Sequence, residues 1–99
     1  GGFYKVKLQL RGDKQLEPIS NDLVDEAAEA TNETRKDFLA NINENDYGYD
    51  FYLSTERITK KILSMLRDEY DPEIKRSYEL IGEENGEEVY RNVVSVRMD

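Results

Sequence analysis

The residues best suited to bind a ligand stand at every second position of the first stretch, GGFYKVKLQLRGD. One alternate set is largely cationic: Phe3, Lys5, Lys7, Gln9 and Arg11. The other set is apolar: Tyr4, Val6, Leu8 and Leu10. Successive side chains of a strand point to opposite sides, so this spacing predicts a half-buried strand with a cationic outer side. Lysine and arginine neutralise phosphate, which makes a nucleic-acid backbone the first ligand to consider.

The chain offers few groups for catalysis or metal binding. Its 99 residues include no Cys and no His, which removes thiol chemistry, disulfides and the usual zinc ligands. Carboxylates are abundant, but none stands in an apolar stretch of the kind that tunes a catalytic acid. The tract NENDYGYD resembles a calcium loop, yet Tyr47 occupies a ligand position and Ser54 replaces the terminal Glu. We therefore expect no enzymatic activity, and no metal or cofactor in this chain.

Charge and length limit the remaining classes of function. A net charge of −8 argues against attraction to nucleic acid averaged over the molecule, so the position of each charge matters. Residues 1–15 carry four bases and one acid, whereas residues 16–34 carry six acids and no base. No apolar run approaches a membrane span and no secretory signal is present, which favours a cytoplasmic location. We expect residues 1–99 to form a single domain, the central fragment of a longer protein, because the chain begins Gly1-Gly2 without Met.

Hydrophobic spacing and turn residues predict the elements that would position these side chains. A first helix is expected after Ser20 as its N-cap, fading within residues 31–35. Two alternating runs around residues 45–48 predict a hairpin. A second helix, capped by Ser54 or Thr55, is expected to end before Asp71-Pro72. Two further strands, over 74–81 and 89–98, flank the type I′ turn signal Asn85-Gly86.

The resulting order, β-α-β-β-α-β-β, indicates an α+β two-layer sandwich. Two helices with one apolar side each should cover one face of a mostly antiparallel five-stranded sheet, in a ferredoxin-like arrangement with an extra strand. The strand residues that then point away from the helices include six basic residues and only two acidic residues. We expect five of these bases to contact phosphates: Lys5, Lys7, Arg11, Arg91 and Arg97. The aromatic ring of Phe3 or Tyr52 would stack on RNA nucleobases.

Each basic surface also has a simpler interpretation. Cations on an exposed sheet keep it soluble and block pairing with other strands, without binding anything. A secondary basic patch lies opposite the apolar stripe of the second helix: Arg57, Lys60, Lys61 and Arg67. This patch can equally be a solvated helix face.

Three stretches, in order, resemble the NMD-three family, which comprises the large ribosomal subunit export adaptor of eukaryotes and its archaeal homologues. GGFYKVKLQLRGD resembles the segment that follows the family's zinc-binding cysteines. YDFYL, followed by a basic helix, resembles its "DFYF" strand and "RKLARxL" helix. Residues 75–82, 88–91 and 94–97 resemble its "LIG…VYRVTVLVRL" close. The resemblance spans nearly the whole chain.

This resemblance implies a fold similar to the eukaryotic type of large-subunit ribosomal protein twenty-two. It implies zinc in the part preceding this chain, and binding to rRNA and ribosomal proteins of the large subunit rather than to a membrane or a small molecule. The role would lie in assembly, stability, export or quality control of that subunit, with a link to mRNA decay. Nuclear shuttling is implied only for a eukaryotic protein. The alternative is a structural spacer, or a protein-binding domain that uses its acidic helix and contacts no RNA.

Overall fold

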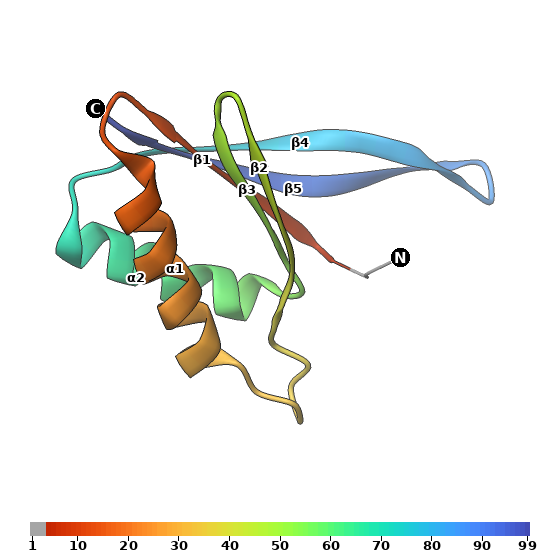
Figure 1. The fold of residues 1–99 in the computed structure, drawn as a ribbon. Coiled ribbons are helices and arrows are strands. Elements are labelled where there is room, and N and C mark those ends of the chain that lie inside the picture. The colour runs from red at the N-terminus through yellow and green to blue at the C-terminus, as the bar shows by residue number, and fades with distance from the viewer. Residues whose placement is uncertain (1–3) are drawn as a thin grey trace.

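The computed structural model describes residues 4–99 and has the predicted order of elements (Figure 1). The elements are β1 (Val6–Gly12), α1 (Leu16–Ala30), β2 (Leu39–Asn45), β3 (Gly48–Leu53), α2 (Glu56–Glu69), β4 (Glu73–Glu84) and β5 (Glu87–Met98). The predicted α+β class is therefore confirmed. Neither helix combines the length and the apolar composition that crossing a membrane requires.

The five strands form one mixed sheet in the order β2-β3-β1-β5-β4. Every neighbouring pair is antiparallel except β1 and β5, which run parallel from Val6 opposite Asn92 to Gly12 opposite Met98. Parallel neighbours need a crossover connection, and both helices lie within the one that joins β1 to β5. The first strand of the chain thus occupies the centre of the sheet.

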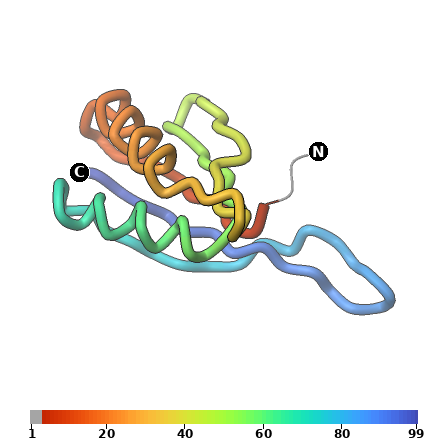
Figure 2. The backbone as a smooth tube through the Cα atoms, turned by 90° about the horizontal axis from the view of Figure 1, so that it is seen from below, coloured from red at the N-terminus to blue at the C-terminus, as the bar shows by residue number. Residues whose placement is uncertain are grey.

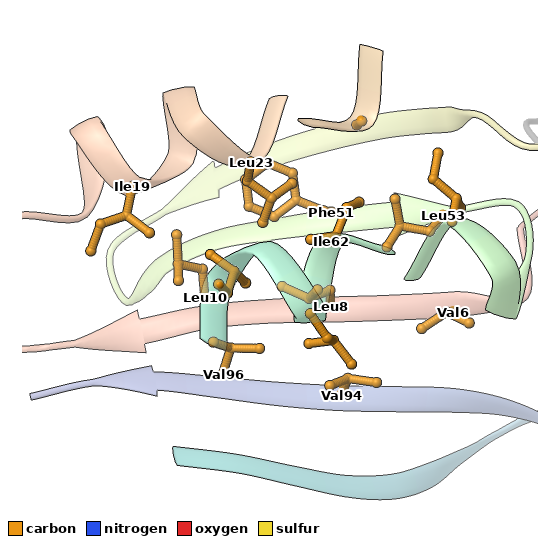
Figure 3. Close-up of a cluster of buried hydrophobic side chains, with 14 of the residues drawn as sticks. Val6, Leu8, Leu10, Ile19, Leu23, Phe51, Leu53, Ile62, Val94 and Val96 are labelled. Carbon is orange, nitrogen blue, oxygen red and sulfur yellow. The ribbon is translucent and has the colours of Figure 1, made fainter. Parts of the chain in front are cut away.

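The core lies between the helices and one face of the sheet (Figure 3). Alternate residues of the central strands point into it and are fully buried: Val6, Leu8, Leu10, Phe51, Leu53, Val94 and Val96. The helices add apolar residues at helical spacing: Ile19, Leu23, Ala27, Ile58, Ile62, Leu63 and Leu66. The other face of the sheet is not covered by either helix, as the sequence predicted.

The two helices begin differently from each other. α1 begins at Leu16, so the prediction of Ser20 as its N-cap is wrong: Ser20 is buried within the helix. Pro18 lies in the first turn, where a missing N–H costs no helical hydrogen bond, and the helix can therefore start before it. Of the two predicted caps of α2, Ser54 and Thr55, it is Thr55 whose side chain accepts a hydrogen bond from the backbone N–H of Ile58.

The strands β4 and β5 are longer than the others and extend beyond the rest of the sheet as a two-stranded ribbon (Figure 2). Its turn has positive φ at Asn85 (53°) and Gly86 (81°), which agrees with the predicted type I′ turn. A register shift between Leu80 and Gly82 bends the ribbon near this end. The ribbon accounts for much of the elongated outline of the molecule, 43 × 30 × 20 Å.

Candidate nucleic-acid interface

The uncovered face of the sheet was expected to be strongly cationic, but its bases are largely neutralised. The guanidinium of Arg11 lies 2.7 Å from the carboxylate of Asp50 and also donates to the backbone carbonyls of Leu10 and Tyr49. Only 19% of the Arg11 side chain and 8% of the Asp50 side chain are exposed. Arg11 is thus a structural cation on this face, with its hydrogen bonds directed at the protein.

Acidic residues of the β4–β5 side neutralise further bases. Arg97 lies 3.1 Å from Asp99, and Lys75 lies 3.5 Å from Glu73. Glu73 stands directly opposite Arg97 in the sheet, so it belongs to the same face. The strand register likewise places a carboxylate, Glu79, opposite Arg91.

The predicted charge of this face is therefore wrong. Within the described residues it carries five bases, Lys7, Arg11, Lys75, Arg91 and Arg97, against four acids, Asp50, Glu73, Glu79 and Asp99. The expected excess was six against two. The face is nearly neutral, and phosphate binding by it has little electrostatic support.

The alternation predicted for the first strand also fails at its beginning. The ring of Tyr4 packs edge-on against Tyr52 at 4.5 Å, and the Arg91 guanidinium lies 3.7 Å above the centre of the Tyr4 ring. Tyr4 was expected on the buried side with Val6, but these contacts place it on the uncovered side. The chain bends at Lys5, just before the strand becomes regular. Phe3, the other predicted stacking residue, lies outside the described residues.

A hollow of about 320 Å³ lies beside the rings of Tyr4 and Tyr52. It is lined by Tyr4, Ala40, Asn41, Asn43 and Tyr52. Ala40 stands at a register shift between β2 and β3, where the regular pairing of the two strands is interrupted. Tyr52, one of the predicted stacking residues, lines this hollow while its ring already packs against the ring of Tyr4.

Lys5 does not lie on the uncovered face, so this part of the prediction is wrong. It lines a hollow with Thr55, Glu56, Arg57 and Lys60, at the beginning of α2. The bend at Lys5 allows its side chain to reach the helix side although Val6 is also buried there. Lys5 thereby joins the residues that were predicted as the secondary patch.

We call the resulting group the basic cluster. It consists of six exposed bases: Lys5, Arg35, Lys36, Arg57, Lys60 and Lys61. Arg35 and Lys36 enter it through the turn before β2, where the Arg57 guanidinium donates to the Arg35 carbonyl over 3.0 Å. The bridge between Asn32 and Asp37 closes that turn, and the Ser54 hydroxyl, which donates to the Lys36 carbonyl at 2.7 Å, holds it near the start of α2.

Two carboxylates within the basic cluster are engaged by protein groups, whereas Lys61 also lines a hollow with Glu26, Asp68 and Glu69. Asp37 is buried and accepts hydrogen bonds from the hydroxyl of Thr55 and, over 3.1 Å, from the guanidinium of Arg57. These two bonds, with the positive charge of Arg57 and Lys61, hold the pKa of the Asp37 carboxyl below its ordinary value, against the opposing effect of burial. Asp37 therefore stays ionised and holds Arg57 in place.

Glu56 is engaged in the same way by two strands. Its carboxylate accepts from the amide of Asn92 at 3.0 Å and pairs with Arg76 at 3.3 Å. Among the described residues, five members of the basic cluster have no carboxylate within ion-pair distance: Lys5, Arg35, Lys36, Lys60 and Lys61. Their charges remain directed at solvent.

The remaining member of the predicted secondary patch lies elsewhere. Arg67 stands in the last turn of α2, about 15 Å along the helix from Arg57 at the usual helical rise. Sequence reasoning missed Arg35 and Lys36, because their proximity to the helix depends on the turn of residues 32–37. Their position directly before the predicted hairpin was the available signal.

Comparisons with known proteins agree with the family resemblance. The chain matches the model of the second domain of NMD3 over residues 3–98, nearly its whole length. No curated protein matches the chain. Within residues 4–99, no three side chains of His, Cys, Asp or Glu come together to hold a metal ion.

Proposed function

The chain belongs to the NMD3 family, a non-enzymatic family of ribosome export adaptors, and we propose that it is a large-subunit-binding module whose basic cluster contacts rRNA phosphates. Membership of the family supports the large ribosomal subunit as the partner. The distribution of charge supplies the surface. The RNA-binding surface is thus assigned to the start of α2, and no longer to the uncovered face of the sheet.

The observation that carries the proposal is the gathering of six exposed bases around a pair of carboxylates that are already engaged. Phosphate oxygens approaching this surface would meet lysine ammonium groups that form no ion pair with a carboxylate of residues 4–99. On the uncovered face they would meet Asp50, Glu73 and Asp99 beside the bases. Repulsion from those carboxylates opposes docking there.

Phosphate contacts of this kind position a protein without reading sequence. We therefore expect binding to depend steeply on salt, with a log–log slope of roughly −0.7 to −0.9 for each phosphate contacted. The acidic side of α1, on a chain of net charge −8, would orient the module by turning away from rRNA.

The test compares two variants that change charge by the same amount. One reverses Lys5, Lys60 and Lys61 to Glu, and the other reverses Lys7, Lys75 and Arg97 to Glu. Each is sedimented with purified large subunits over a salt series, after circular dichroism has verified its fold. We expect the first variant to lose at least about tenfold in affinity and to flatten the salt dependence, because three phosphate contacts are removed. The second should bind like the parent chain.

The opposite ranking of the two variants would assign binding to the uncovered face. Equal affinity of both variants and the parent would exclude phosphate docking by either surface. Failure of the parent chain to sediment with subunits even at low salt would overturn the proposal and favour a spacer role.

A further inference from the structure

A second surface, independent of the proposed function, lies on the part of the β4–β5 ribbon that extends beyond the sheet. We call residues 78–91 the arm. It carries four large apolar side chains in solvent, with exposed fractions of 75% for Tyr78, 55% for Leu80, 45% for Ile81 and 53% for Tyr90. Leu80 stands opposite Tyr90, and Tyr78 is two residues along the same strand face, so these three form one apolar stripe.

The arm lacks the support that the rest of the sheet has. β1 pairs with β5 only from Asn92 onward, and β4 is the edge of the sheet, so the arm is a two-stranded ribbon in the described structure. A two-stranded ribbon is at best marginally stable alone in water. Exposed apolar side chains gathered on such a ribbon are typical of an interaction surface.

Charge indicates what kind of partner would fit. Beyond the stripe, Glu83 stands directly opposite Glu88, and Glu84 directly opposite Glu87. Facing like charges destabilise a strand pair. The arm thus places two repelling carboxylate pairs next to an apolar stripe, and cations between them would stabilise it.

We propose that the arm binds a lysine- and arginine-rich protein segment that also carries apolar side chains. The apolar residues would cover Tyr78, Leu80 and Tyr90, and the cations would neutralise the facing glutamates at the tip. The arm's carboxylates would repel RNA phosphates, which excludes RNA as its occupant. A second copy meeting arm to arm would add glutamates to glutamates, so self-association through this surface is opposed as well.

The test is a titration of the isotope-labelled chain with synthetic peptides, followed residue by residue by NMR. The chain has its own buried core, so it is used alone. One peptide alternates Lys with Leu, and a second alternates Lys with Ser at the same length and charge. We expect chemical-shift changes confined to the arm, and binding of the Lys-Leu peptide at least about tenfold tighter, because only its apolar side chains can bury the stripe.

Two variants separate the apolar and charged contributions. Tyr78→Ser combined with Leu80→Ser and Tyr90→Ser should weaken binding of the Lys-Leu peptide at least about tenfold. Glu83→Gln combined with Glu84→Gln and Glu87→Gln should weaken it too, while removing the cross-strand repulsion. The matched control removes three carboxylates from α1, with Asp25→Asn, Glu26→Gln and Glu29→Gln, and should leave binding unchanged.

Every other outcome overturns the proposal. Shift changes on α1, or spread over both acidic surfaces, would show attraction by charge alone, as would equal affinity for the two peptides. An RNA oligonucleotide that shifts the arm would assign it to nucleic acid. Concentration-dependent dimerisation, abolished by the three serine substitutions, would assign it to a second copy of the chain. None of these measurements uses ribosomal subunits, so their result does not depend on the proposed function.

Discussion

Arg11 of β1 and Asp50 of β3 lie 2.7 Å apart across the uncovered face of the sheet and form its best-enclosed ion pair. The Asp50 carboxylate also accepts from the amide of Asn45 at 3.2 Å, so the pair connects three neighbouring strands. A cation that satisfies a buried carboxylate in this way has a structural task. The alternation of Arg11 with apolar residues in the sequence is therefore not evidence that Arg11 binds phosphate.

Replacing Arg11 with Met should lower the free energy of unfolding by about 1–3 kcal/mol, because the buried Asp50 carboxylate would lose the hydrogen bond from its partner at 2.7 Å. Urea unfolding measures this change. The matched control is Lys7→Met on the same strand and face: Lys7 forms no ion pair within residues 4–99, so this change should alter stability by less than about 0.5 kcal/mol. Equal effects of the two substitutions would contradict the structural task of Arg11.

Asp37 should make stability depend on acid pH. Its pKa is lowered in the folded protein, so its contribution is present above its unfolded pKa, near 3.8, and is lost as pH falls through the folded value. Asp37→Asn should therefore be less stable than the parent at neutral pH, since the amide cannot hold Arg57 by charge. The difference should shrink as the solution is acidified below about pH 4. Thermal unfolding over a pH series tests this, and a difference independent of pH would contradict it.

Gly12 should not tolerate a side chain. Its φ is 138°, and a Cβ there would overlap the backbone carbonyl of Met98 on the neighbouring strand. Gly12→Ala should cost at least roughly 2 kcal/mol in the free energy of unfolding. Gly82 has open space around it and no positive φ, so Gly82→Ala should be close to neutral. Comparable destabilisation of both variants would argue against this close strand contact.

The sequence predicted the elements well because their signals are local. The cap of α2 and the turn at Asn85-Gly86 depend on a few adjacent residues: the sequence limited the cap to Ser54 or Thr55 and located the turn. The charge of the uncovered face was predicted poorly because it depends on register. Whether Glu73 lies opposite Arg97 is decided by the pairing of β4 with β5, which no single strand reveals.

The basic cluster shows the same limit for a functional surface. The bases of the second helix were recognised from helical spacing. Lys5 was assigned to the wrong side because strict alternation was extended through a bend in the main chain. Arg35 and Lys36 required the tertiary position of a turn. Long-range contacts thus bring the members of the basic cluster together, and the periodicity within each element could predict only some of them.

Asn92 breaks the apolar pattern of β5, and its contact with Glu56 explains why. Position 92 lies on the helix side where α2 begins, and its amide donates to the Glu56 carboxylate at 3.0 Å. A carboxylate in the first turn is stabilised by the positive end of the helix, and Arg76 pairs with it from β4. The polar side chain at position 92 therefore helps to join the start of α2 to β4 and β5 at the base of the arm.

This contact predicts a specific pattern in a double-mutant cycle. Asn92→Asp should lower the free energy of unfolding by about 1–2 kcal/mol, because a second carboxylate would face Glu56. Adding Glu56→Gln should recover much of that loss, since a neutral amide can donate to the new carboxylate. Urea unfolding of the parent, both single variants and the double variant gives the coupling energy, which should be at least about 0.5 kcal/mol in magnitude. Strict additivity would show that Asn92 and Glu56 do not interact, and the polar break in β5 would then need another cause.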